Sequence, residues 1–200
     1  MLKTILFDVD GVIIKRKRYF SECFSQEFGV PMDTMFAFFE NEFQQCLVGK
    51  ADLKKELSKY ALQWGWEKSV DELLVYWFSR ESEIDDRIME SLQAIRKRGI
   101  RCYLATNNET YRATYLLNAL GLRERVDGIF ASHDLGWLKT KKEFWEAVHV
   151  SLGKGDKNQV LVWDDDERNI QSAARFGFHA EHFTSFTEYQ KKMRSLLALS

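Results

Sequence analysis

The hydrophobic and polar positions follow two different patterns along the chain. Residues 3–9 form a short apolar run that ends in acidic residues and Gly11, which predicts a buried strand breaking into a loop. From about residue 18 to residue 83 the pattern predicts helices and no credible strand. The predicted helices of this stretch are Tyr19–Phe28, Asp33–Val48, Asp52–Trp64 and Val70–Arg80.

After Ile84 strands and helices alternate. The predicted strands are Arg101–Ala105, Gly128–Ala131, Gln159–Trp163 and His179–Phe183, and the predicted helices are Asp86–Arg98, Thr110–Leu120, Lys141–Leu152 and Arg168–Phe176. Such alternation is typical of βαβ units, which form a parallel sheet with helices on both faces. We therefore predict an α/β fold, with a doubly wound parallel sheet in a core domain of residues 1–15 and 84–200. A small all-helical cap domain, residues 16–83, is predicted as an insert after the first strand.

Composition and charge narrow the class of protein. Of the 200 residues, 45% are hydrophobic and 30% are charged, which is typical of a globular enzyme and not of a disordered chain. The formal net charge of -1 does not favour nucleic acid or an anionic membrane as a partner. No apolar run reaches the roughly 18 residues that a membrane span needs, and no signal peptide is visible. Three scattered cysteines predict no disulfide framework, so we expect a soluble, cytoplasmic protein.

Four short polar segments follow predicted strands, at the edge where open α/β sheets bind their ligands. The first contains Asp8 and Asp10, whose side chains point to the same side of an extended segment, and Gly11, which allows a sharp turn. Two carboxylates this close repel each other unless a cation or a shared proton lies between them. The alternative is a pair of solvated acids in a loop.

The second segment contains Thr106, Asn107 and Asn108 directly after a predicted strand. A hydroxyl group, side-chain amides and freed backbone N–H groups are suited to binding phosphate oxygens. The alternative is a group of capping residues for the helix that follows.

The third segment contains Lys139 near the start of a predicted helix. A cation at this end of a helix is unfavourable with the helix dipole unless an anion lies nearby. The alternative is a plain surface lysine like its neighbours Lys141 and Lys142.

The fourth segment contains Asp164, Asp165, Asp166 and Glu167 at a strand end and a helix start. Crowded carboxylates supply the oxygen ligands that Mg²⁺ prefers. The alternative is capping, because acidic residues at a helix start are favourable without a metal.

In chain order the four segments read Asp-x-Asp, Thr-Asn, Lys and Asp-Asp. The haloacid dehalogenase (HAD) superfamily carries its four motifs in this order, and the sequence strongly resembles it in the first strand and from about Ile84 to Phe183. The helical insert matches only in position and in helical character. The resemblance implies a Rossmann-like core and a hydrolase of the phosphatase branch, with a helical cap between the first and second motifs.

The resemblance also implies roles for single residues. Asp8 would be the nucleophile that carries an aspartyl-phosphate, and Asp10 would be the general acid and base. Lys139 would neutralise charge on Asp8 and on the phosphoryl group. Thr106 and Asn107 would bind the substrate phosphate.

A Mg²⁺ cofactor is implied as well. Its ligands would be Asp8, Asp10 through the backbone carbonyl, and Asp165. Asp164 and Asn169 would lie beside these ligands. Asp166 stands where relatives often have serine and receives no catalytic role, and Thr140 replaces the proline that most relatives have after the motif lysine.

The implied function is a Mg²⁺-dependent phosphatase of small phosphomonoesters, such as a sugar phosphate or a related metabolite. A phosphomutase of the β-phosphoglucomutase type remains an alternative, because it keeps all four motifs. A binding or regulatory protein for a phosphorylated metabolite, without turnover, is a second alternative. The sequence leaves open whether the protein is a monomer or a homodimer.

In such enzymes a helical insert acts as a lid that excludes water and selects the leaving group. The insert is rich in aromatic residues, most of which we expect to fill its own core. A few of them would face the site and stack on a sugar or a base. We also hypothesise that Arg16 or Arg18 steers an anionic substrate.

Overall fold

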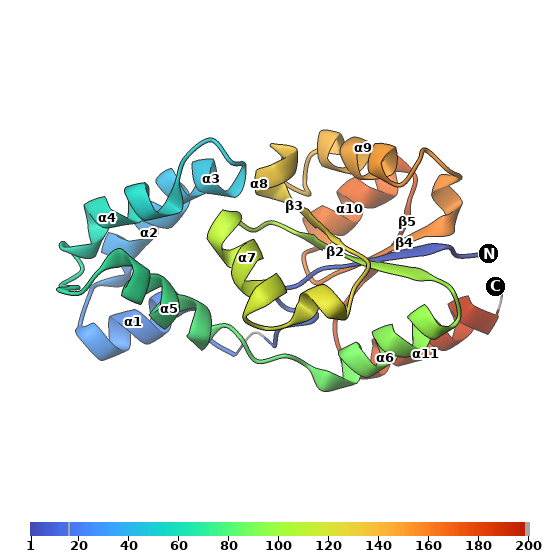
Figure 1. Cartoon of the computed structure of the whole chain (residues 1–200), viewed down its shortest axis with the longest axis horizontal. Helices are drawn as coiled ribbons and strands as arrows, with labels where there is room; N and C mark the ends of the chain where they lie inside the picture. The colour runs from blue at the N-terminus through green and yellow to red at the C-terminus, as the bar shows by residue number, and fades with distance from the viewer. Residues whose placement is uncertain (16, 199–200) are drawn as a thin grey trace.

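The computed structural model describes residues 1–15 and 17–198. A five-stranded, fully parallel sheet lies at its centre, with the strand order β3-β2-β1-β4-β5 (Figure 1). The strands are β1 (Thr4–Phe7), β2 (Arg101–Thr106), β3 (Ile129–Ala131), β4 (Val160–Asp164) and β5 (His179–His182). The predicted doubly wound parallel sheet is confirmed.

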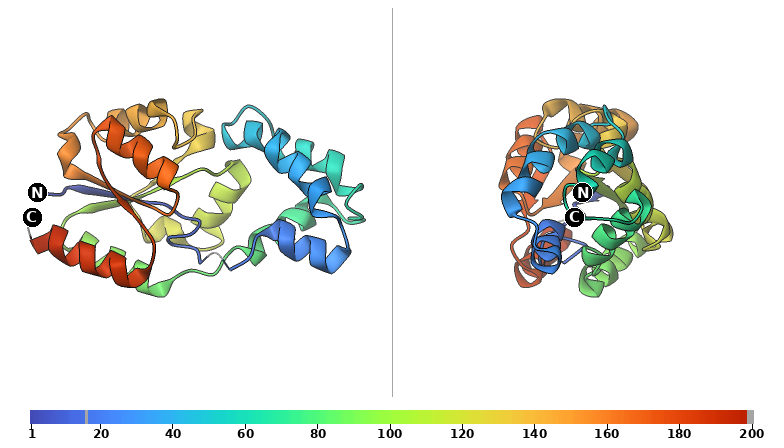
Figure 2. Two further views of the ribbon diagram at one scale, coloured as in Figure 1. Left: turned by 180° about the vertical axis from the view of Figure 1, so that it is seen from behind. Right: turned by 90° about the vertical axis from the view of Figure 1, so that its left-hand side faces the viewer.

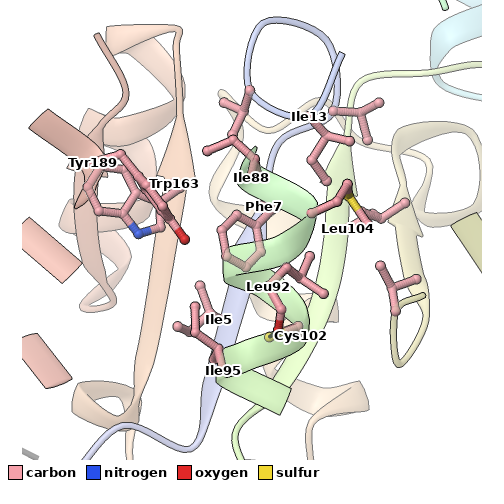
Figure 3. Packing of buried hydrophobic residues seen from close by; sticks show 14 of the residues in the cluster. Ile5, Phe7, Ile13, Ile88, Leu92, Ile95, Cys102, Leu104, Trp163 and Tyr189 are labelled. Carbon is pink, nitrogen blue, oxygen red and sulfur yellow. Dashed lines mark hydrogen bonds between the residues drawn. The ribbon is translucent and has the colours of Figure 1, made fainter. Parts of the chain in front are cut away.

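Alternating side chains of the strands form two hydrophobic layers, because successive residues of a strand point to opposite faces. On one face Ile5 and Phe7 pack against the helix that carries Leu92 and Ile95 (Figure 3). On the other face Leu6 packs against the two helices that carry Trp145 and Ala173. The first face is covered by α6 (Asp86–Lys97) and α11 (Phe186–Ala198), and the second by α9 (Lys142–Ser151) and α10 (Glu167–Phe176) (Figures 1 and 2).

The central position of β1 brings the strand ends together. Phe7 at the end of β1 lies opposite Leu104 of β2 on one side and Trp163 of β4 on the other. The residues that follow these three strands therefore meet at one edge of the sheet. Along the chain, α7 (Thr110–Asn118) and a short 3-10 helix, Leu122–Glu124, come between β2 and β3. The short helix α8 (Ser132–Leu135) and a second 3-10 helix, Lys157–Gln159, come between β3 and β4.

Five helices of the insert lie beyond this edge, while both chain termini lie at the opposite end of the molecule (Figures 1 and 2). They have their own hydrophobic cluster, which includes Phe20, Phe24, Phe38, Trp64 and Trp77. The helices are α1 (Phe20–Phe28), α2 (Met32–Glu40), α3 (Glu42–Leu47), α4 (Leu53–Ala61) and α5 (Val70–Arg80).

The prediction of one helix over Asp33–Val48 is wrong. The chain leaves the helical conformation at Asn41, with φ −114° and ψ −88°, so that α2 and α3 are separate helices. The side-chain amide of Asn41 donates to the carbonyl oxygen of Ala37 at 2.7 Å, and Gln44 donates to that of Phe39 at 2.8 Å. Side chains thus satisfy carbonyl groups that a continuous helix would have bonded internally.

Two chain segments connect the insert to the sheet, and they run side by side. The Lys15 N–H donates to the Glu83 carbonyl and the Asp85 N–H to the Ile13 carbonyl, each at 2.8 Å. The boundaries of the predicted core and cap domains fall in these segments and stay a prediction, and residue 16 lies outside the described residues. In the described part of the chain, no helix is long and apolar enough to cross a membrane.

Candidate active site

Asp8 follows β1 directly and is buried in the sheet edge. Its N–H donates to the Trp163 carbonyl at 2.8 Å, which continues the pairing of β1 with β4 by one residue. The residue is only 6% exposed. The alternative of solvated acids is therefore wrong for Asp8, and a buried carboxylate needs a charged partner.

Lys139 supplies that partner. It is 1% exposed, and its Nζ lies 2.5 Å from Oδ1 of Asp8 and 2.7 Å from Oδ2 of Asp164. Its backbone N–H donates to Oδ1 of Asn107 at 2.9 Å, which ties the loop before α9 to the end of β2. Lys139 is thus not a surface lysine, and the anions that its position called for are two buried carboxylates.

Burial and neighbouring charges act on the pKa of both partners. Burial raises the pKa of Asp8 well above its ordinary value; the charge of Lys139 opposes this rise and the carboxylate of Asp164 adds to it. Burial alone would lower the pKa of Lys139, but the carboxylates of Asp8 and Asp164 outweigh it and hold this pKa above its ordinary value. Lys139 is therefore positively charged at neutral pH, beside Asp8 and Asp164.

The acidic residues at the end of β4 divide into two roles. Asp164 is enclosed: besides Lys139, it accepts from the Asp166 N–H at 2.9 Å and from the side-chain amide of Asn169 at 3.1 Å. Asp165 turns toward the loop after β1, where a Cβ on Gly11 would lie 2.2 Å from its Oδ2. Gly11 also has φ +110°, so only glycine allows this close approach.

Asp8, Asp164 and Asp165 form a group of carboxylates suited to a metal ion. One oxygen of each lies within 4.8 Å of the others. Lys139 pairs with two of these carboxylates, Asp8 and Asp164, and a divalent cation bound by all three would offset the repulsion among them. Oδ1 of Asn169 is also buried and lacks a hydrogen-bond partner among the described residues. This set of hard oxygen donors fits Mg²⁺.

Two other acidic residues of the four segments lie outside this group. The Asp10 carboxylate is not part of it, and the predicted metal contact of Asp10 through its backbone carbonyl stays a prediction. Asp166 caps α10 by accepting from the Arg168 N–H at 2.9 Å.

The Thr106–Asn108 segment closes the site on the β2 side. Thr106 is buried, and its Oγ1 accepts from the side-chain amide of Asn108 at 2.6 Å. These residues do not cap α7, because Glu109 does so with a carboxylate that accepts from the N–H groups of Tyr111 and Arg112. The capping alternative is therefore wrong for Thr106 and Asn107.

Asp10 is held by two side chains from the start of α7. Its Oδ2 accepts from the Asn108 amide at 2.7 Å, and its Oδ1 accepts from Nη2 of Arg112 at 2.9 Å. Arg112 is buried and also donates to the carbonyl oxygens of Phe78 and Glu81 at the end of α5. It thus joins the carboxylate of the predicted acid and base to the insert.

No motif pointed to Arg112. The available signal was the one used for Lys139, namely a cation in the first turn of a helix, where the dipole disfavours it.

A cavity of about 390 Å³ lies between the insert and the sheet edge. Asp10, Asn107 and Arg112 are among the polar residues that line it. Arg18 also lines it, while Arg16 lies outside the described residues. The first and second polar segments thus reach the wall of the cavity, whereas no residue of the third or fourth segment lines it.

Comparison with known families gives one match over most of the chain. The family model for haloacid dehalogenase-like hydrolases matches residues 2–177. This range contains β1, the helical insert and all four polar segments.

Several solved structures share the fold over nearly their whole length. A HAD family enzyme from Bacteroides thetaiotaomicron, in complex with magnesium and inorganic phosphate, superposes with a TM-score of 0.78 at 19% identity, over 93% of this chain and 96% of that one. A predicted HAD-like family hydrolase from Porphyromonas gingivalis gives a TM-score of 0.76 at 19% identity, over 97% and 98%. An L-2-haloacid dehalogenase from Xanthobacter autotrophicus, with chloropropionic acid covalently bound, gives 0.65 at 16% identity, over 98% and 83%. At these identities the likeness is one of fold.

Proposed function

The chain belongs to the haloacid dehalogenase-like hydrolases and is therefore an enzyme; from this we propose that it is a Mg²⁺-dependent phosphatase of small phosphomonoesters that works through an aspartyl-phosphate on Asp8. The observation that carries the proposal is the group of carboxylates formed by Asp8, Asp164 and Asp165, the first two of which are buried and paired with Lys139. The magnesium and inorganic phosphate of the similar Bacteroides thetaiotaomicron enzyme support the same chemistry.

In the first step, an oxygen of Asp8 attacks phosphorus and the bond from phosphorus to the ester oxygen breaks. Asp10 gives its proton to the leaving oxygen, for which it is suited by its place at the wall of the cavity. Thr106 and Asn107 hold the phosphoryl oxygens, and Lys139 balances the charge on Asp8.

Asp8, Asp165 and the backbone carbonyl of Asp10 would hold the Mg²⁺ ion, with Asp164 and Asn169 beside them. When bound, the ion supplies positive charge that offsets the crowding of carboxylate and phosphoryl oxygens.

In the second step, water attacks the phosphorus of the aspartyl-phosphate. Asp10, now ionised, accepts a proton from that water. The bond between phosphorus and Asp8 breaks, inorganic phosphate leaves, and Asp8 is regenerated as a carboxylate. Arg112 and Asn108 keep the Asp10 carboxylate oriented through both steps.

Release of inorganic phosphate tests this proposal. The panel contains an aryl phosphate, sugar phosphates (the substrates that the sequence favours) and nucleotides, each assayed with Mg²⁺ and with EDTA. Asp8→Asn is the matched variant, because it removes the nucleophilic charge with little change in shape. We expect turnover that requires Mg²⁺ and is lost in Asp8→Asn.

Two results would contradict the proposal. Turnover retained in Asp8→Asn would remove Asp8 as the nucleophile. Absence of phosphate release from the whole panel, with Mg²⁺ still bound, would favour the phosphomutase or the phosphometabolite-binding alternative.

A further inference from the structure

Aromatic side chains make up much of the wall of the cavity beside Asp10. They come from four helices of the insert or the segments next to them. The aromatic residues that line the cavity are Tyr19, Phe20, Phe36, Phe39, Phe43, Trp77 and Phe78, and polar residues that line it with them include Lys15, Arg18, Ser21 and Gln44. At about 390 Å³ the cavity is within the range of small-molecule pockets, which is roughly 300–1,000 Å³.

The rings of this wall are fixed by contacts with one another. Phe20 and Trp77 are stacked, with centroids 4.8 Å apart and an interplanar angle of 18°. Phe39 meets Trp77 edge-on, at 5.5 Å and 88°. Offset-stacked and edge-to-face arrangements are the favourable ones for aromatic rings, so the wall is rigid and offers flat apolar surfaces.

Polar groups next to Trp77, Phe39 and Phe20 have partners within the insert. The Trp77 indole N–H donates to Oε2 of Glu81 at 3.1 Å, and the Gln44 amide donates to the Phe39 carbonyl at 2.8 Å. Oε1 of Glu81 accepts from the Phe20 N–H at 2.6 Å. A ligand hydroxyl group placed against these three rings would compete with these hydrogen bonds, and buried hydroxyl groups without partners cost free energy.

We propose that this cavity binds a planar aromatic leaving group, so that the substrate is the phosphomonoester of an alcohol that carries an aromatic ring system. The inference rests on the proposed phosphatase function and narrows its substrate class away from simple sugar phosphates. With the phosphoryl group at Asp8 and the ester oxygen beside Asp10, the ring of the leaving group packs against the wall that Phe36, Phe39 and Phe43 help to form. Stacking on these side chains then supplies binding free energy without new hydrogen bonds.

Three phosphomonoesters of primary alcohols test the proposal, because their leaving groups are chemically alike. They are naphthylethyl phosphate, hexyl phosphate and glucose 6-phosphate. We expect kcat/KM for naphthylethyl phosphate to exceed that for either of the others by at least about tenfold. The same order is expected for the dissociation constants measured by calorimetry with Asp8→Asn and Mg²⁺, where no turnover intervenes.

Phe36 and Phe28 offer a matched pair of variants. Both are half-exposed phenylalanines of the insert, 43% and 41% exposed, but only Phe36 lines the cavity. We expect Phe36→Ala to lower the preference for naphthylethyl phosphate over glucose 6-phosphate by about fivefold. Phe28→Ala should leave this ratio unchanged.

Glucose 6-phosphate used or bound as well as naphthylethyl phosphate would overturn the aromatic assignment and leave the phosphatase proposal standing. Hexyl phosphate used as well would overturn it too, since an apolar chain would then suffice. If no ester were hydrolysed, the phosphatase proposal would fail. The dissociation constants measured by calorimetry would then test the aromatic ligand class by themselves. Tighter binding of naphthylethyl phosphate than of the other two esters, weakened by Phe36→Ala, would support the aromatic assignment. Any other order of the dissociation constants would overturn it.

Discussion

Lys139 is the residue on which the charge balance of the site depends. It is enclosed by the sheet edge and forms ion pairs with two buried carboxylates, Asp8 and Asp164. The desolvation of three charged groups is tolerated only while all three remain paired.

Replacement of this lysine should therefore affect folding as well as activity. We expect Lys139→Met, in EDTA, to lower the free energy of unfolding by about 3–5 kcal/mol, because two buried carboxylates lose their cation. Urea denaturation followed by circular dichroism measures the change. Lys142→Met is the control, since Lys142 is exposed and its surface ion pair with Glu146 contributes little to stability. Equal losses in both variants would contradict the account.

Two capping glutamates should affect the pH dependence of stability with opposite signs. Burial raises the pKa of Glu109 in the folded protein above its ordinary value, so its stabilising contribution is present at low pH and is lost as pH rises through this raised pKa. The hydrogen bond from the Ser69 side chain lowers the pKa of Glu72, so its contribution is present at neutral pH and is lost as pH falls through the lowered pKa.

Denaturation curves of Glu109→Gln and Glu72→Gln between about pH 4 and pH 8 test these signs. Relative to the unmodified protein, Glu109→Gln should lose least stability at the high end of this range. Glu72→Gln should lose most there. If the stability lost by the two variants changed with pH in the same direction, the environment of one of the two glutamates would be described wrongly.

At this scale the sequence predicted much of the site but not all of it. Thr106 and Asp164 end strands, Asp8, Asn107 and Asp165 directly follow strands, and strand ends in a parallel sheet must meet. Lys139 lies in the loop between α8 and α9. Arg112 could not be predicted because its partners, Asp10 and two carbonyl groups at the end of α5, come together only when the insert packs on α7. No spacing along the chain contains that information.

At the scale of helices and strands, the contact between the end of α3 and α8 is one of those that join the insert to the core, in addition to the hydrogen bonds of Arg112 to the end of α5. Oγ of Ser132 donates to the Leu47 carbonyl at 2.5 Å. Close by, Gly49 has φ +70°, and a Cβ at this position would lie 2.3 Å from the His133 carbonyl oxygen. The backbone at Gly49 therefore lies so close to the backbone of α8 that only glycine fits at position 49.

Gly49→Ala should push these two backbones apart. We expect faster amide hydrogen exchange in α3 and α8 and a higher KM, because the cover over the cavity fits less tightly. Gly65→Ala is a close control: it has φ +71°, but its Cβ would meet no atom within 4 Å. Both variants bear the backbone cost of a left-handed alanine, so only the difference between them reports on the contact. Identical exchange patterns would remove its proposed role.

Prediction of the elements failed for different reasons at Asn41 and at α11. The spacing of Phe36, Phe39 and Phe43 stays helical across the break at Asn41, so the hydrophobic pattern could not show the break. Helix α11 follows the last strand and was not predicted, although Phe186, Tyr189 and Met193 have helical spacing. Its burial depends on Trp163 of β4, whose ring lies 4.9 Å from that of Tyr189 (Figure 3). Tertiary packing thus stabilises a helix that the local sequence pattern indicates only weakly.

At the scale of the whole molecule, the carboxylate group exists only when β1 and β4 lie side by side. A cation that binds it therefore binds the folded chain and not the unfolded one, and it stabilises the fold by mass action.

Thermal denaturation with and without Mg²⁺ tests this linkage. At a free concentration of about 100 times its Kd, Mg²⁺ should stabilise the fold by about 2.7 kcal/mol and raise the Tm. Asp165→Asn should abolish the Mg²⁺-dependent shift. Asp166→Asn should keep it, because Asp166 caps α10 and lies outside the carboxylate group. A shift of equal size in both variants would place the ion elsewhere.

The class of fold followed from alternating strands and helices, whereas the substrate class did not follow from any motif. The aromatic wall near Asp10 is built by rings from four separate parts of the insert, and most of these residues, though not Tyr19 or Phe36, also belong to the hydrophobic cluster of the insert. Composition showed that aromatic residues are abundant there, but only packing shows which of them face the cavity.

The most direct test of the central claim is to trap the covalent intermediate. The protein is mixed with Mg²⁺ and a substrate from the phosphatase panel, quenched in acid within the turnover time, digested, and analysed by mass spectrometry. The account predicts one added phosphoryl group on the peptide that contains Asp8, and none in Asp8→Asn treated in the same way. A phosphoryl group on another residue, or phosphate release without any covalent adduct in a quench faster than turnover, would contradict it.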